Sequence, residues 1–398
     1  MKKIIAIVAI FCCFFLASCG SNTDVDVLNV YNWGEYISDG SEGSLDVNKE
    51  FVKYYEEKHG RKLKLNYTTY ASNEDMYNKL RSGGVSYDLI IPSDYMIEKM
   101  IHEDMLLPLN FDNIPNYQYI DEQYKYAFYD KTAEYTVPYT CGYVGIIYNT
   151  SLIDETPNDW DCLWDDAYSG QILQFNNPRD AFGTAMYALG IDVNTKNTDL
   201  WRKSMEVLKK QKPLVQSYVM DEIFNKMKNG SAALAPYYAG DFLSMYGDNE
   251  DLAFFYPKSG TNIFVDAMCI PNCAKNKEIA EEYINFCLSE EIAVANAEYI
   301  CYASPNTLVR DNETYREDMT EMHEDAMEIL YQTEGIVSSY YENLDAATTN
   351  TLNSLWEELK IENAIEPWIY IFSGSIIFIV LLYLLYRFVQ KKINEKYY

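Results

Sequence analysis

The chain has 398 residues, of which 48% are apolar, and its formal net charge is -28. This length exceeds one ordinary core and predicts two lobes or domains, and an apolar content that includes 37 tyrosines excludes a largely disordered chain. The negative charge excludes nucleic acid as a partner, because its phosphates would be repelled. The charge permits a cationic ligand, although acidity alone more often serves only to keep a protein soluble.

The N-terminus has the pattern of a secretory signal. Two lysines precede an apolar run over residues 4–16, and small residues follow, which is typical of a signal peptide over residues 1–18. The end of this segment, LASC, resembles the bacterial lipobox, in which the cysteine, Cys19, is lipidated and becomes the mature N-terminus. We expect residues 19–26 to be a linker from that lipid. The alternative is an uncleaved anchor.

The first third of the body alternates strands and helices, which predicts a parallel sheet with helices on both faces. Ligands of such sheets bind beyond the carboxyl ends of the strands. Trp33 follows the first expected strand and Ser93 and Tyr95 follow the third, so these side chains can share one crevice. The expected strands are 27–31, 62–67 and 87–91, and the expected helices are 46–59, 73–81 and 95–104.

A second alternating region follows, and a strand-rich segment over residues 254–270 crosses back toward the first. Two α/β lobes joined by two crossings would place a cleft between them, and hinged clefts of this kind close on small ligands. A further strand is expected at 143–149, after a segment over 135–139, and another segment lies over 232–238. The expected helices are 181–189, 200–210, 220–228, 277–288, 291–299 and 318–334. We expect lobe 1 to comprise 27–139 and 267–317, and lobe 2 to comprise 140–266 and 318–362.

The C-terminus carries a second membrane signal. Residues 368–386 contain no charge over nineteen positions, close to the roughly 20 that cross a bilayer. Three basic residues follow between positions 387 and 392, and basic residues mark the cytoplasmic side. We expect a transmembrane helix over 367–389, a basic cytoplasmic tail over 390–398, and a body outside the cell membrane. The alternative is a buried core helix.

Six cysteines remain beyond the signal and the lipobox. An exported chain could pair some of them, but the spacing shows no zinc pattern and does not define a connectivity. Most are expected to be buried small hydrophobic residues. They are Cys141, Cys162, Cys269, Cys273, Cys287 and Cys301.

Motifs for catalysis are absent from the sequence. It contains no Walker A loop, no GxSxG elbow and no HExxH helix, and its three histidines lie far apart. With 60 acidic residues, an isolated acid pair carries no information. We therefore expect no enzyme activity, no cofactor and no metal site.

Five motifs occur in one order along the body and carry a family likeness. They are YNWGEY, DLIIPSDYMIEKM, TVPYTCGYVGIIYN, NNPRDAFGTAMYALG and the set VDAMCIPNCAKNK, INFCLS and YASPN. Together they resemble the spermidine/putrescine-binding proteins, the substrate-binding components of bacterial polyamine ABC importers, from about Val27 to Lys360. The resemblance implies an α/β, two-lobe periplasmic-binding-protein fold (type II-like), a polyamine ligand, and an ABC permease with its ATPase subunits as partners.

A polyamine is a flexible methylene chain with several ammonium groups, so its site needs carboxylates at the nitrogens and flat apolar walls along the methylenes. Aromatic rings can also attract the cations through their faces, by about 0.5–2 kcal/mol each. The resemblance places the family's aromatic box at Trp33, Tyr36, Tyr95, Tyr238, Phe264 and Tyr302, its anions at Asp180, Asp266 and Glu342, and further polar contacts at Glu35, Ser93 and Asn177.

The sequence departs from the family pattern at several of these positions. Asn177 stands where many relatives have Asp, Tyr238 and Phe264 stand where relatives often have Trp, and Glu342 stands where Gln is expected. Glu35 adds an anion, caps a turn or faces solvent. These changes leave ligand length open. Two alternatives remain. One is the same fold bound to another organic cation, and the other, suggested by the expected C-terminal helix, is the ectodomain of a polyamine sensor.

Overall fold

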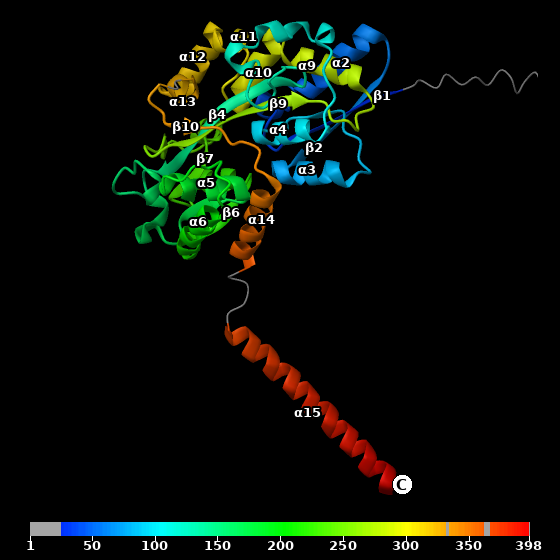
Figure 1. The fold of residues 1–398 in the computed structure, drawn as a ribbon, viewed down its shortest axis with the longest axis vertical. Helices are drawn as coiled ribbons and strands as arrows, with labels where there is room; N and C mark the ends of the chain where they lie inside the picture. The colour runs from blue at the N-terminus through cyan, green and yellow to red at the C-terminus, as the bar shows by residue number, and fades with distance from the viewer. Residues whose placement is uncertain (1–24, 332–333, 362–366, 398) are drawn as a thin grey trace, which may run out of the picture.

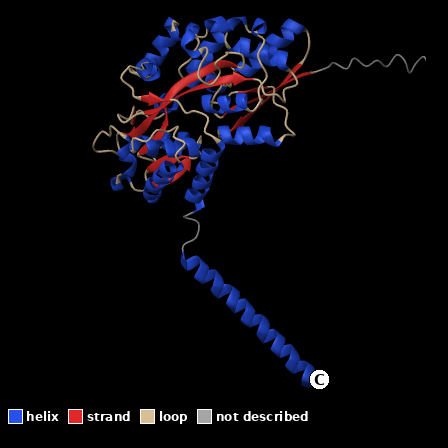
Figure 2. Cartoon of the chain, viewed as in Figure 1, coloured by secondary structure: helices blue, strands red, loops and turns tan. Residues whose placement is uncertain are grey.

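The structure, a computed structural model, describes residues 25–331, 334–361 and 367–397. The expected signal peptide and the expected lipidation site Cys19 lie outside the described residues. Two groups of strands form the centre of the body, and helices cover each group (Figures 1 and 2). This arrangement matches the two-lobe α/β prediction.

The first group of strands is the predicted parallel unit. β1 (Asp26–Trp33) lies between β2 (Leu63–Tyr70) and β3 (Leu89–Ile90) and runs parallel to both. In this register Val30 pairs with Leu89, which brings the carboxyl ends of β1 and β3 to one edge. The βαβαβ prediction is therefore confirmed. The helices of this unit are α2 (Val47–His59), α3 (Asn73–Ser82) and α4 (Asp94–His102).

Local capping explains where the first two helices begin and end. The Asp46 side chain accepts a hydrogen bond from the backbone N–H of Lys49 at the start of α2, and Gly60 ends the helix with a φ of 64°. The Ser72 hydroxyl accepts from the N–H of Asp75 at the start of α3. Such caps satisfy N–H groups that have no partner inside the helix. The start of α3 is thereby fixed beside the carboxyl end of β2.

Two long antiparallel strands, β4 (Thr136–Asn149) and β9 (Thr261–Cys269), join the two groups. The first half of β4 pairs with β9, and its second half pairs with β7 and β8. The segment expected at 135–139 and the strand expected at 143–149 form one continuous strand, β4. The ladder only shifts register between Pro138 and Thr140, because a proline without an N–H disturbs one rung without ending the strand.

The second group of strands lies beyond β4. β5 runs parallel to β6 and β7, whereas β7 runs antiparallel to β4, so the whole sheet is mixed. The predicted crossing back at 254–270 is confirmed as β8 followed by β9. The elements of this group are β5 (Ile172–Phe175), α5 (Pro178–Ala188), α6 (Thr198–Gln211), β6 (Val215–Val219), α7 (Glu222–Lys228), β7 (Leu234–Tyr238), α8 (Ala239–Tyr246) and β8 (Leu252–Phe255).

The helices at 307–310 and 346–361 were not predicted, and one expected helix is divided. The helix expected over 318–334 is two helices, because His323 adopts an extended conformation (φ -152°, ψ 126°) and its ring Nδ1 accepts a hydrogen bond from the N–H of Asp325. The helices of this region are α9 (Lys277–Cys287), α10 (Glu290–Ile300), α11 (Thr307–Arg310), α12 (Glu313–Met322) and α13 (Ala326–Tyr331).

Buried side chains form a core beneath each group of strands. In the first group, Leu28 and Val30 of β1 pack in one cluster with Phe51 of α2 and Ile284 of α9. A larger cluster includes Phe175 of β5 and continues across the crossing strands. The larger cluster also contains Tyr31 of β1 and Met76 of α3, so buried side chains continue from one group of strands into the other.

A third segment, residues 338–345, runs along the junction between the two groups. β10 (Ser338–Ser339) pairs with the start of β9. Farther along, the N–H of Asn343 donates to Glu98 of α4 (2.8 Å). The segment then leads into α14 (Ala346–Ile361), which packs on α5 and α6 of the second group. A third segment of the chain therefore lies at the junction of the two groups of strands, in addition to the two predicted crossings.

The C-terminal helix α15 (Pro367–Tyr397) stands apart from the body in Figure 1. Within the described ranges, it is the helix long and apolar enough to cross a membrane, and its apolar span Gly374–Lys392 is not buried against other parts of the chain. The six cysteines predicted to remain are all free in the structure, and three of them, Cys141, Cys269 and Cys301, are buried.

Candidate ligand-binding site

A cavity lies between the two groups of strands and encloses about 740 Å³ of space, solvent at its mouth included. Its wall is built from the residues after β1 and β3, the first turns of α3, α4, α5 and α8, and the middle of β9. Ten of the twelve predicted site residues line it: Trp33, Tyr36, Ser93, Tyr95, Asn177, Asp180, Tyr238, Phe264, Asp266 and Tyr302. Residues far apart in the sequence are thereby brought to one surface.

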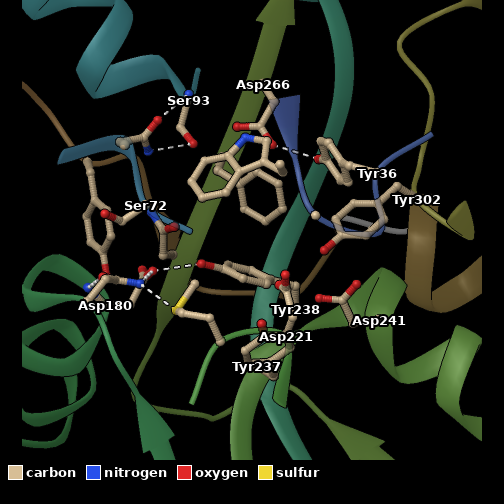
Figure 3. A pocket seen from close by; sticks show the side chains of 18 of the residues that line it. Tyr36, Ser72, Ser93, Asp180, Asp221, Tyr237, Tyr238, Asp241, Asp266 and Tyr302 are labelled. Carbon is tan, nitrogen blue, oxygen red and sulfur yellow. Dashed lines mark hydrogen bonds between the residues drawn. The ribbon is translucent and has the colours of Figure 1, made fainter. Parts of the chain in front are cut away.

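Asp266 lies in the middle of the cavity wall (Figure 3). It is on β9 and is 5% exposed. The Tyr36 hydroxyl donates to its Oδ2 (2.6 Å) and also contacts the Thr140 hydroxyl on the neighbouring strand β4. Its other oxygen, Oδ1, is buried and has no hydrogen-bond partner among the described residues. A carboxylate oxygen in this state is costly unless a ligand donates to it.

Asp180 is held by the N-terminus of α5. The Asn177 side chain caps this helix, because its oxygen accepts from the N–H of Asp180 (2.8 Å) and its nitrogen donates to Asp180 Oδ2 (2.7 Å). The Tyr238 hydroxyl donates to the same oxygen (2.7 Å). Asn177 lines the cavity, but both ends of its amide are already used. Its main effect is therefore to orient Asp180 toward the cavity.

Four further acidic residues line the cavity and were not predicted. Glu74 accepts a hydrogen bond from the Tyr95 hydroxyl (3.0 Å), and Asp94 Oδ2 accepts from the N–H of Val265 (3.2 Å). Sequence signals existed for two of them, since Asp94 lies between the predicted residues Ser93 and Tyr95 and Asp241 lies one helical turn after Tyr238. The four are Glu74, Asp94, Asp221 and Asp241.

All six acids of the cavity have pKa values raised by burial. Desolvation is the main cause in each case, and it raises the pKa of Asp266 to about 6 and that of Asp241 to about 8. The pKa values of Glu74, Asp94, Asp180 and Asp221 are also raised. Burial disfavours the charged form of a carboxyl group. A cation that pairs with one of these groups would offset the penalty there.

Aromatic rings form the remaining wall. Tyr302 meets Tyr36 edge to face (4.9 Å between ring centroids), and Phe264 meets Tyr238 in the same way (5.3 Å). The Trp33 indole donates to the carbonyl of Ile91 (2.9 Å), which fixes the ring at the end of β1. Edge-to-face pairs are a preferred packing for rings. They leave flat faces toward the cavity.

Asp221 contacts the opposite wall closely. A Cβ added at Gly34, which follows β1, would overlap Asp221 Oδ2, which precedes α7. Gly34 therefore allows the two groups of strands to approach. Asp221 and Asp241 also lie close enough to Glu35 for their like charges to interact.

Two predicted residues are not brought into the cavity. Glu35 has a positive φ of 47° and its side chain is exposed outside the lining. The Glu342 side chain is exposed as well, and Tyr341 lines the cavity in its place. No sharp motif marks this segment, so its position relative to the family pattern was not fixed by the sequence. Glu342 is not among the residues that line the cavity.

The chemistry of the wall selects for positive charge. Among the residues that the structure describes, none of those lining the cavity is Lys, Arg or His. The same residues include no cluster of acids, cysteines and histidines arranged to hold a metal ion. Several carboxyl groups beside ring faces can pair with ammonium groups and cover methylenes.

Comparison with known proteins identifies the class. The two-lobe α/β fold with a cavity at the junction of the lobes is the fold of periplasmic binding proteins, which confirms the predicted fold class. The chain matches the family of bacterial extracellular solute-binding proteins over residues 50–322. It belongs to this family.

Relatives with assigned names are similar over most of the chain. The spermidine/putrescine-binding periplasmic protein of Salmonella typhimurium is 30% identical over 81% of this chain and 93% of its own length. A spermidine/putrescine ABC transporter substrate-binding protein from Streptococcus pneumoniae has a TM-score of 0.66 at 31% identity, covering 84% of this chain and 99% of its own. A Listeria monocytogenes structure, provisionally assigned to a spermidine/putrescine ABC transporter, reaches 0.75 at 32% identity, covering 85% and 100%.

Proposed function

We propose that the chain binds a polyamine of the spermidine and putrescine class outside the cell and delivers it to an ABC importer, without catalysing a reaction. One observation carries this proposal: six carboxyl groups and several aromatic rings face one cavity into which no cationic side chain projects, within the described residues. The names of the relatives at 30% identity and above support the same ligand class.

The expected free energy of binding is compatible with a small cation as the ligand. Burial of the methylenes of putrescine contributes about 3 kcal/mol, at roughly 0.8 kcal/mol for each CH₂. A ligand of about six heavy atoms has a ceiling near -9 kcal/mol, which corresponds to sub-micromolar affinity. Each ammonium must meet a carboxylate as it leaves water, because an unpaired buried charge costs several kcal/mol.

The proposed ligand set follows from the cavity. In Figure 3, Asp180 lies at the left of the rings and Asp241 at the right, and Asp266 lies above them. We assign ligand contacts to nine of the ten predicted residues that line the cavity, all except Asn177, and to five that were not predicted: Glu74, Asp94, Asp221, Asp241 and Tyr341. On this proposal the two lobes close on the ligand. The expected lobe boundary at residues 317/318 falls inside α12, which packs on α10 and α13.

Titration calorimetry on the full chain in detergent tests the proposed function. Putrescine, spermidine and spermine should be compared with 1,4-butanediol, which has the methylenes without the charges, and with a panel of other organic cations. We expect micromolar or tighter binding of at least one polyamine and no binding of the diol. Tighter binding of a different cation, or equal binding of the diol, would contradict the ligand class.

We propose in addition that the body is held at the membrane twice, by a lipid on Cys19 and by α15. Contacts of α14 fasten this end of the chain to the second group of strands. Lys360 Nζ donates to Asn176 Oδ1 (2.6 Å), and Lys209 Nζ lies 2.9 Å from Glu358 Oε1. A force applied to α15 would therefore be transmitted first to the second lobe, on which α14 packs.

Membrane fractionation tests the double anchor. Cys19→Ala alone and a chain ending at residue 366 alone should each stay with the membrane, whereas the two changes combined should release the body. If either single change releases all of the protein, there is only one anchor.

A further inference from the structure

Arg179 is a buried cation immediately behind the cavity wall. It precedes Asp180 in the first turn of α5 and is 3% exposed. No ion pair joins it to a carboxylate within the described ranges of the chain, and its Nε has no hydrogen-bond partner there. A buried charge without a paired acid is expensive and calls for a function.

The Arg179 guanidinium instead forms hydrogen bonds that hold the segment over residues 338–345. Its Nη1 donates to the carbonyl of Val193 (2.9 Å), and its Nη2 donates to Asn194 Oδ1 (2.8 Å) and to the carbonyl of Glu342 (3.2 Å). Asn194 completes the grip, because its Oδ1 accepts from the N–H of Glu342 (2.9 Å) and its Nδ2 donates to the carbonyl of Tyr340 (2.8 Å). The backbone on both sides of Tyr341 is thereby fixed.

Rings separate the guanidinium from the cavity. Its carbon lies 4.4 Å from the centre of the Tyr341 ring and 5.9 Å from that of the Tyr95 ring, and both rings line the cavity. The Tyr341 hydroxyl lies against Gly183 so closely that a Cβ there would overlap it. It also faces Asp180 closely enough to stabilise the carboxylate.

We propose that Arg179 is a positioning residue for the ligand: it holds Tyr341 against Asp180 and places a fixed positive charge behind this wall of the cavity. The inference rests on the proposed polyamine function and extends it to a residue that the ligand does not touch. Arg is suited to this task because its guanidinium stays charged and offers a rigid fork of donors.

Several titratable groups of the surrounding elements face Arg179 and Asp180. They determine the pH range over which loss of the arginine charge affects ligand binding. The positive charge of Arg179 lowers the pKa of Asp180 and of Glu74 against the larger effect of burial. The other groups near the pair are Glu74, Asp94, Tyr95, Tyr187, Tyr238 and Asp266. Removal of the arginine charge should therefore matter more at low pH, where Asp180 would take up a proton.

Putrescine titrations of the full chain at pH 6 and pH 8.5 test this role with three variants. Arg179→Gln removes the positive charge and the guanidinium hydrogen bonds that hold the backbone around Tyr341. We therefore expect at least a tenfold loss of affinity at pH 6 and a smaller loss at pH 8.5. Arg179→Lys keeps the charge but lacks the planar set of guanidinium donors, so its loss of putrescine affinity should be the same at both pH values. Gly183→Ala displaces Tyr341 and leaves Arg179 in place, so its loss should also be independent of pH.

Wild-type affinity in Arg179→Gln would overturn the proposal. The proposal would also be overturned if Arg179→Gln lost as much affinity as Arg179→Lys at pH 6 and again at pH 8.5, because removal of the charge would then have no effect of its own. If Arg179→Gln does not fold by circular dichroism, the other two variants decide: a loss in both supports the grip on Tyr341, and wild-type affinity in both overturns it. The wild-type titration separates the two claims, since a wild type that binds no polyamine overturns the proposed function itself.

Discussion

Replacement of Asp266 by Asn is expected to weaken polyamine binding by at least tenfold. Asp266 offers a buried Oδ1 without a partner, and Tyr36 already occupies its other oxygen. An amide has no charge to pair with an ammonium, and loss of one partner from a buried ion pair costs about 3–5 kcal/mol. Calorimetric titration of the full-length variant with putrescine and spermidine measures the effect.

Asp251→Asn is a matched control for this variant. It makes the same chemical change at an exposed side chain outside the cavity, so affinity should change by less than about twofold. The circular dichroism of both variants should match the wild type. An Asp266→Asn protein that is folded and binds as tightly as the control would remove Asp266 from the site.

Polyamine affinity is expected to rise at least tenfold between pH 5 and pH 8. Burial raises the pKa of Asp266 to about 6 and that of Asp241 to about 8 in the empty protein, so both carry protons at pH 5. An ammonium binds the ionised form and expels those protons, whereas the ligand amines, like lysine, keep their own charge over this range. Binding should therefore release protons, and the release should be greatest near neutral pH.

The stability of the empty protein should show the opposite trend. A carboxyl whose folded pKa is raised stabilises the fold fully below its unfolded value of about 4, and this contribution disappears as the pH rises through the folded value. For Asp241 the window ends near pH 8. Asp241→Asn should therefore raise the Tm of the empty protein more at pH 8 than at pH 5.

Calorimetry in two buffers of different ionisation enthalpy measures the proton release, and thermal unfolding with and without spermidine measures the stability. The difference in Tm between the two conditions should widen as the pH rises. Affinity that is constant from pH 5 to pH 8, with no proton release, would mean that these carboxyl groups are already ionised in the empty protein or do not meet the ligand.

The parts of the site that sequence predicted are those with strong local signals. Trp33 and Tyr95 were placed together because parallel strands bring their carboxyl ends to one edge, and the register of β1 with β3 confirms the reasoning. Asp180 was placed by the resemblance of its NNPRDAF motif to a known family, and the structure brings it to the cavity wall. The first inference needed only periodicity and strand polarity, whereas the second needed the family motif.

The parts that sequence missed depend on contacts between distant segments. Asp221 enters the cavity only because Gly34, far away in the chain, lets it approach. Tyr341 enters it because Arg179 and Asn194 grip the backbone around it, which a local pattern cannot reveal. The break at His323 and the continuous β4 likewise reflect packing and pairing across the molecule rather than local propensity.

A crystal structure of the body with bound spermidine is the most direct test of a cation held between two lobes. The account predicts ammonium nitrogens about 3 Å from the carboxylates of Asp266 and Asp180, with the methylenes against the rings of Trp33 and Phe264. Spermidine bound on an outer surface, with those carboxylates and rings left uncontacted, would contradict it.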